Sequence, residues 1–193
     1  MDTRDAVELI REAIPRPEGD WADLGCGDGG FTRALAELIG ANGRIYALDR
    51  DARAISALGR WAKRHAPQLV PIVADLSGPF ELPGLGERKL AGILIANALH
   101  YVPETDAVLA RLAARLRLGG RVVIVEYEQE VATRWVPYPI PARRLPALAT
   151  AAGLSPFVVT ATRPSAFGGL LYAAAAERPV LPAARRPAAR EAE

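Results

Sequence analysis

Short apolar runs alternate along this chain with longer stretches in which apolar residues recur every three or four positions. Short continuous runs are typical of strands buried on both faces of a sheet, whereas the longer stretches have the period of an amphipathic helix. Strands and helices that alternate in this way predict an α/β fold with a parallel sheet. The earlier runs lie at residues 21–24, 44–49, 69–75, 92–97 and 121–126.

Helices are expected where the apolar spacing is helical and is closed by glycine or proline. One such stretch begins at Thr105, carries apolar residues from Val108 to Leu116, and is expected to end at Gly119-Gly120. The other helices are expected over residues 5–13, 31–40, 51–66 and 143–153.

Two features indicate how the strands are ordered. Pro71 lies inside the third run, and because proline cannot donate to a strand ladder, this strand is expected at a sheet edge. The last two runs, Phe157–Thr162 and Leu170–Ala174, are joined by a short connection through Arg163–Ser165. A parallel crossover needs about 10 to 12 residues or more, including its helix. The final two strands are therefore expected to be antiparallel.

Composition bounds the class of protein. The 193-residue chain is half hydrophobic, carries a net charge of +2 and contains one cysteine. These values fit a single domain, expected over residues 1–176, with a Pro-, Ala- and Arg-rich segment at 177–193 expected to be a disordered tail. Scattered arginines argue against a nucleic-acid groove. The absence of a signal-like start and of a long apolar run leads us to expect a cytoplasmic protein without a membrane span, and no metal site is expected.

The first run ends in the glycine-rich stretch Asp23-Leu24-Gly25-Cys26-Gly27-Asp28-Gly29-Gly30, which a helical pattern follows. Glycines there permit a tight turn and let a ligand approach the backbone at a helix N-terminus. The spacing fits both the dinucleotide fingerprint and the turn that binds S-adenosylmethionine. By itself this stretch leaves both cofactors open.

Polar side chains mark the ends of the predicted strands: Asp23, Asp49, Asp75, Asn97 and Glu126. In an open parallel sheet, ligands bind at the carboxyl ends of the strands, near the point where the strand order reverses. An acid at the end of the second strand accepts hydrogen bonds from a ribose diol, which both cofactors carry. Asp75 and the following backbone N–H offer an acceptor beside a donor, the complement of an adenine edge.

Taken together, the motifs resemble those of class I S-adenosylmethionine-dependent methyltransferases in order and spacing. The resemblance covers about residues 20–176, nearly the whole folded part. It implies a doubly wound, Rossmann-like sheet of order 3-2-1-4-5-7-6, in which only strand 7 is antiparallel, and the antiparallel final pair agrees with this order. The segments that carry the resemblance are Asp23–Gly29, Ala47–Asp49, Val73–Leu76, Ile95–His100 and Leu116–Val122.

The resemblance also implies roles for individual residues. The methionine part of the cofactor would lie over the turn, with Asp23 near its ammonium group and Cys26 as a small residue of the turn rather than a nucleophile. Arg50 stands where the family often has an apolar residue against the adenine, so its aliphatic stem or a guanidinium stack would make that contact. The implied cofactor-binding residues are Asp23, Gly25, Cys26 and Gly27 for methionine, Asp49 for ribose, Arg50, Asp75 and Leu76 for adenine, and Asn97 beside the methyl and sulfur.

His100 follows the fourth strand and is the candidate catalytic residue. Two interpretations stay open: a general base on the acceptor side of the methyl group, or a hydrogen-bonded wall residue. A methyl on a sulfonium is already activated, so positioning can supply much of the catalysis and a base matters only for a protonated acceptor. Trp135 and Tyr138 could cover an acceptor pocket or close the end of the core, and the pocket is slightly favoured.

Among function classes, methyl transfer from S-adenosylmethionine to a small-molecule acceptor fits the sequence best. The first alternative is a nicotinamide-dependent oxidoreductase, against which stand the missing Tyr-x-x-x-Lys pattern and the antiparallel end. A binding-only member of the methyltransferase fold is the second. The segment Asn97-Ala98-Leu99-His100 lacks the Asn-Pro-Pro-aromatic form of many amino-group methyltransferases. Neither the acceptor nor the oligomeric state is encoded in a recognisable pattern.

Overall fold

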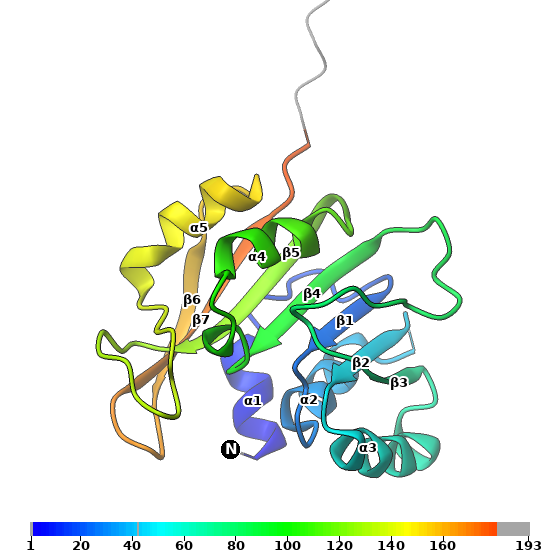
Figure 1. Ribbon diagram of the computed structural model, residues 1–193. Coiled ribbons are helices and arrows are strands. Elements are labelled where there is room, and N and C mark those ends of the chain that lie inside the picture. The colour runs from blue at the N-terminus through cyan, green and yellow to red at the C-terminus, as the bar shows by residue number, and fades with distance from the viewer. Residues whose placement is uncertain (1, 42, 181–193) are drawn as a thin grey trace, which may run out of the picture.

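A single mixed sheet runs through the computed structural model, which describes residues 2–41 and 43–180 (Figure 1). The sheet has seven strands in the order β3-β2-β1-β4-β5-β7-β6. The pairs from β3 to β5 are parallel, whereas β7 is antiparallel to both β5 and β6. The predicted fold is confirmed. The strands are β1 (Trp21–Leu24), β2 (Ile45–Asp49), β3 (Leu69–Val73), β4 (Leu90–Ala96), β5 (Leu116–Tyr127), β6 (Val158–Pro164) and β7 (Leu170–Glu177).

Helices cover both faces of the sheet, with α1, α2 and α3 on one side and α4 and α5 on the other (Figure 1). Each layer encloses its own cluster of buried apolar side chains, so the central strands are buried on both faces, as their continuous apolar runs predict. The helices are α1 (Thr3–Ile10), α2 (Gly30–Ile39), α3 (Ala52–His65), α4 (Thr105–Ala113) and α5 (Leu145–Ala152), with short 3-10 turns η1 (Leu99–Tyr101) and η2 (Ala142–Arg144).

Several boundaries follow from the local chemistry that the sequence indicates. The Asp51 carboxylate accepts hydrogen bonds from the backbone N–H groups of Arg53 and Ala54, which caps α3. Gly153 ends α5 in the left-handed conformation. Pro71 lies in β3, opposite Ala47 of β2. Because β3 is an edge strand, no strand lies on its outer side to need the backbone N–H that proline lacks.

One expected boundary is wrong. The helix that begins at Thr105 ends at Ala113 rather than at Gly119-Gly120, and Leu116 already belongs to β5, opposite Leu90. The register then shifts before Arg121 pairs with Gly92. Gly119 has φ 70°, and a Cβ on Gly120 would lie 2.8 Å from the Arg117 carbonyl oxygen, so the two glycines permit an irregularity within the strand. The apolar spacing up to Leu116 fits a helix face and a buried strand start equally well.

The last strand extends past the expected domain boundary at Ala176. Glu177 is its final residue and accepts from Arg121 Nη2 at 2.5 Å. The backbone N–H of Arg178 donates to Gly120 at 2.8 Å, and its guanidinium donates to the Leu116 carbonyl oxygen at 2.6 Å. The predicted tail beyond residue 180 lies outside the described residues. Within the described ranges, no helix is long and apolar enough to cross a membrane.

These contacts predict that a chain ending after Ala176 unfolds at a lower temperature than one ending after Val180. The shorter chain loses the Arg121–Glu177 ion pair and the Arg178 hydrogen bonds. At about 1 kcal/mol per hydrogen bond and about 2–4 °C per kcal/mol, the melting temperature should fall by about 5 °C or more. Arg178→Ala in the longer chain is the control that isolates the guanidinium. Equal melting temperatures for the two chain lengths would show that these contacts contribute nothing.

Candidate active site

The glycine turn joins β1 to α2 at the carboxyl edge of the sheet. The N–H groups of Gly25 and Cys26 both donate to the Leu48 carbonyl oxygen, at 2.7 and 3.0 Å, which fixes the turn against β2. Gly25 has φ 77°, and a Cβ there would lie 2.4 Å from the Cβ of Ala98. At Gly27, with φ 53°, a Cβ would meet nothing within 4 Å. Gly25 is therefore required by close packing, whereas Gly27 borders open space.

Two cavities lie on either side of this turn. The larger has a volume of about 600 Å³ and the smaller about 360 Å³, both within the range of small-molecule sites. Gly25, Gly27 and Asn97 line both cavities, so the two spaces meet where the ends of β1 and β4 are adjacent. The smaller cavity is lined by Gly25, Gly27, Asp49, Arg50, Ala74, Asp75, Leu76, Ser77, Asn97, Ala98, Tyr101 and Val102.

Asp49 and Asp75 face the smaller cavity from the ends of β2 and β3. The Asp49 carboxylate accepts from the Gly27 N–H at 2.7 Å and from the Asp51 N–H at 2.8 Å, one bond on each oxygen. Each oxygen keeps a second lone pair for a ligand. Asp75 accepts from the N–H and the hydroxyl of Ser77, and these bonds lower the pKa of its carboxyl. Of the predicted cofactor residues, Arg50 and Leu76 line the same cavity.

Asn97 lies at the junction of the two cavities. Among the residues that the structure describes, it is the only non-glycine with positive φ, at 52°. Its backbone N–H donates to the Val125 carbonyl oxygen at 2.8 Å, whereas its side-chain Oδ1 is buried without a hydrogen-bond partner among those residues. A strained backbone and an unpaired acceptor on one residue are typical of a ligand contact.

Asp23 is buried beneath the turn rather than facing a cavity. Its carboxyl group is fully buried and the residue lines neither cavity, so its contact with a methionine ammonium stays a prediction. Thr32 donates to Oδ2 at 2.6 Å, and Oδ1 has no partner among the described residues. Burial raises the pKa of Asp23 to about 7, against the lowering effect of the Thr32 bond. Burial also raises the pKa of the Cys26 thiol, which is consistent with a small turn residue rather than a nucleophile.

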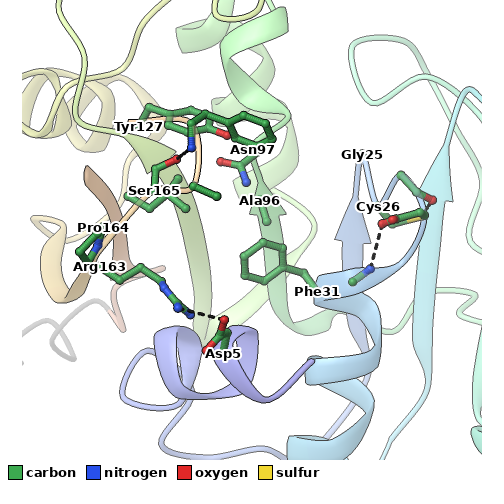
Figure 2. A pocket seen from close by; sticks show the side chains of 16 residues that line it. Asp5, Gly25, Cys26, Phe31, Ala96, Asn97, Tyr127, Arg163, Pro164 and Ser165 are labelled. Carbon is green, nitrogen blue, oxygen red and sulfur yellow. Dashed lines mark hydrogen bonds and ion pairs between the residues drawn. The ribbon is translucent and has the colours of Figure 1, made fainter. Parts of the chain in front are cut away.

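The larger cavity is bounded by the glycine turn and the end of β4 and, beyond them, by segments that carry no recognised motif. Figure 2 shows Phe31 of α2 on one side and Asn97 with Tyr127 on another, while Asp5 of α1 and Arg163 of β6 form an ion pair away from Asn97. That pair has an N–O distance of 3.0 Å. Apart from Asn97, the sequence offered no signal for these residues, because only the fold brings them together. The lining comprises Asp5, Gly25, Cys26, Gly27, Asp28, Gly30, Phe31, Ala96, Asn97, Tyr127, Arg163, Pro164, Ser165, Ala166, Phe167 and Leu171.

His100 is 2% exposed and forms a buried pair with Glu126 at the end of β5. Its Nδ1 lies 2.6 Å from Glu126 Oε2, and its backbone N–H donates to Oε1 at 3.2 Å. The imidazole lies beside the rings of Tyr101 and Tyr127, with centroid distances of 4.4 and 6.0 Å. These two tyrosines line the smaller and the larger cavity respectively, although His100 lines neither.

Other expectations about this region have mixed outcomes. Glu126 was recognised as a strand end, but its pairing with His100 was not anticipated. Trp135 and Tyr138 line neither cavity, so the suggestion that they cover an acceptor pocket has no support in these contacts. Within the described ranges, no group of three or more His, Cys, Asp or Glu side chains could hold a metal ion.

The raised pKa of Asp23 predicts a pH-dependent stability. In the folded chain this carboxyl keeps its proton up to about pH 7, whereas the unfolded carboxyl loses it near 3.8, so its ionisation destabilises the fold as pH rises through that window. The stability gained by Asp23→Asn should therefore be about 2 to 3 kcal/mol larger at pH 8 than at pH 5. Denaturant unfolding at the two pH values measures this. Asp75→Asn is the control, because the lowered pKa of Asp75 keeps it ionised throughout, so its effect should be the same at both. An Asp23→Asn effect that does not change with pH would contradict the raised pKa.

Comparison with known proteins identifies the family to which this architecture belongs. A family model described as a methyltransferase domain matches residues 22–120. The 2-phytyl-1,4-naphtoquinone methyltransferase of Thermosynechococcus vestitus is 31% identical over 122 residues, which cover 62% of this chain and 52% of the relative. The trans-aconitate 2-methyltransferase of Delftia acidovorans is 31% identical over 123 residues, covering 63% and 43%. The chain thus spans about half the length of the curated relatives it matches.

Solved structures agree at the level of the fold. A SAM dependent methyltransferase from Aquifex aeolicus superposes with a TM-score of 0.63 at 16% identity, covering 91% of this chain and 98% of that one. The strand order and the antiparallel β7 are the arrangement that the resemblance implies. A nicotinamide-dependent oxidoreductase is not favoured by any of these findings. The chain belongs to the class I S-adenosylmethionine-dependent methyltransferases, and S-adenosylmethionine is the cofactor of its family.

Proposed function

We propose that this protein transfers a methyl group from S-adenosylmethionine to a small-molecule acceptor bound in the larger cavity. The observation that carries the proposal is the junction of the two cavities at Gly25, Gly27 and Asn97. A cofactor that lies across this junction would occupy the smaller cavity with its adenosine and leave part of the larger one for an acceptor. When bound, S-adenosylmethionine supplies a methyl group already activated by its sulfonium.

The residues of the smaller cavity fit that cofactor. Asp49 has free lone pairs for two ribose hydroxyls, and Asp75 with the Leu76 N–H matches an adenine edge. The exposed stem of Arg50 can lie against the base. Open space beside Gly27 admits a ligand close to the backbone, and the unpaired Oδ1 of Asn97 offers an acceptor at the junction.

His100 and Glu126 support acid–base chemistry at the acceptor. With Nδ1–H donating to the Glu126 carboxylate across the 2.6 Å contact, a neutral imidazole would keep its lone pair on Nε2. The structure gives Nε2 no hydrogen-bond partner among the described residues, whereas a purely packed histidine would be expected to have both ring nitrogens bonded. A base oriented by a carboxylate is a recurring arrangement for proton abstraction. We propose that His100 takes the acceptor's proton and that Glu126 orients its ring. Because the imidazole lines neither cavity, this role requires the ring of Tyr101 or Tyr127 beside it to move when the acceptor binds.

The first expected outcome concerns the cofactor. S-adenosylmethionine and S-adenosylhomocysteine should bind in calorimetric titrations whereas NADH should not. Asp49→Ala should weaken both by about tenfold or more, because each lost bond to a charged acceptor is worth about 1.5 to 3 kcal/mol. Asp51→Ala is the matched control, since it removes the α3 cap but lines neither cavity, and it should lower stability without changing affinity. Unchanged affinity in Asp49→Ala would rule out this placement of the ribose.

The second expected outcome concerns His100. With an acceptor that the wild-type protein methylates, His100→Ala should lower kcat by about 100-fold or more, and added imidazole should restore part of the rate. Glu126→Gln keeps the shape of the pair but not its charge, and should lower kcat while the cofactor dissociation constant stays the same. If His100 is only a wall, His100→Ala should instead lower melting temperature and cofactor affinity together, with little change in kcat. That result would leave positioning alone as the mechanism.

A further inference from the structure

Arg163 is the guanidinium that lines the acceptor side of the larger cavity, and it is paired with Asp5 at 3.0 Å. An anionic ligand there would meet a cation whose charge a carboxylate already offsets. Asp28 belongs to the glycine turn, where its carboxylate accepts from the Gly30 N–H at 3.3 Å. An anionic acceptor would therefore lose hydration without gaining an uncompensated cation as its partner.

The remaining acceptor-side lining is mostly apolar and partly aromatic, and Ser165 and Tyr127 contribute its hydroxyl groups. Phe31 and Tyr127 lie on two sides of the space in Figure 2, and the buried strand residues Ala96 and Leu171 also line it. Aromatic walls favour planar apolar ligands, because rings pack in stacked or edge-to-face arrangements. The cavity therefore suits an uncharged, planar molecule.

The hairpin between β6 and β7 adds an unusual side chain at the same cavity. Phe167 lines it and is nevertheless 89% exposed, and the adjacent Leu170 is 45% exposed. The turn is built rather than loose: the Phe167 N–H donates to the Ser165 hydroxyl at 3.0 Å, and the Ser165 N–H donates to the Gly169 carbonyl oxygen at 3.0 Å. An ordered turn that holds a large apolar ring in water is explained if a ligand covers the ring.

We infer that the acceptor is an uncharged, planar apolar molecule, that Phe167 determines its affinity, and that the Asp5–Arg163 pair excludes anionic analogues. This inference rests on the proposed methyl transfer and specifies the acceptor class. Phe167 contacts the ligand from the hairpin. The ion pair disfavours anionic ligands because Asp5 offsets the charge of Arg163. An acceptor of this class that also carries a hydroxyl would meet the need for a proton that His100 can remove.

The test uses two probes with the same naphthalene ring, neutral 2-naphthol and anionic 2-naphthoate, titrated at pH 7.5 into the full chain saturated with S-adenosylhomocysteine. The neutral probe should bind at least about tenfold more tightly than the anion, because the anion is desolvated without a partner. Phe167→Ala should weaken 2-naphthol by about fivefold or more through lost apolar contact, with S-adenosylhomocysteine affinity unchanged. Val158→Ala is the control, because Val158 is an exposed β6 residue that does not line the cavity.

The role of the ion pair has its own variants. Asp5→Asn removes the carboxylate that offsets Arg163. This variant should therefore bind 2-naphthoate at least about fivefold more tightly than the wild type does, and adding Arg163→Gln should remove that gain. Three results would each overturn the inference while the proposed function stands. They are wild-type binding of 2-naphthoate that is as tight as that of 2-naphthol or tighter, no wild-type binding of 2-naphthol at all, and an unaltered affinity of Phe167→Ala for 2-naphthol. Failure of S-adenosylhomocysteine itself to bind would instead overturn the proposed function.

Discussion

The close approach of Gly25 to Ala98 is the constraint on which the site depends. The strand order reverses between β1 and β4, and there the turn after β1 packs against the segment after β4 with no room for a side chain. A methyl group at Gly25 would move either the turn or the segment that carries Asn97, and the two cavities would no longer meet at the same atoms. The amide of Gly27, bonded to Asp49, ties the same turn to the end of β2.

A second interaction fixes the segment after β4 relative to β5. The His100–Glu126 pair joins the 3-10 turn after β4 to the end of β5, and both side chains are buried. A buried pair of this kind is costly unless its hydrogen bonds are well made, and Glu126 uses one oxygen for the imidazole and the other for the backbone. The neighbouring Tyr101 and Tyr127 each face a different cavity, so the pair fixes the walls of both.

Much of the fold followed from the sequence because each clue was local. Pro71 indicated the edge strand, and the short connection before Leu170 indicated the antiparallel pair. The predicted end of α4 was wrong because apolar residues up to Leu116 fit a helix and a strand alike. Only the pairing of Leu116 with Leu90 decides between them. Gly119 and Gly120 indicate a helix end in the sequence, but in the structure they lie at the register shift within β5.

The site was predictable only in part, for the same reason. Asp49, Asp75 and Asn97 follow directly from strand ends, which a parallel sheet gathers at one edge, whereas the acceptor side is assembled from α1, α2 and the β6–β7 hairpin. No local pattern joins Asp5 to Arg163 or places Phe167 at a cavity, so these residues needed the fold.

A crystal structure of the complex with S-adenosylhomocysteine tests the central claim most directly. The account predicts the sulfur beside Asn97 at the junction of the two cavities, the ribose on Asp49 and the adenine by Asp75 and Leu76, with the larger cavity left open toward the sulfur. A ligand bound elsewhere, or in the reverse orientation with its adenine in the larger cavity, would contradict it.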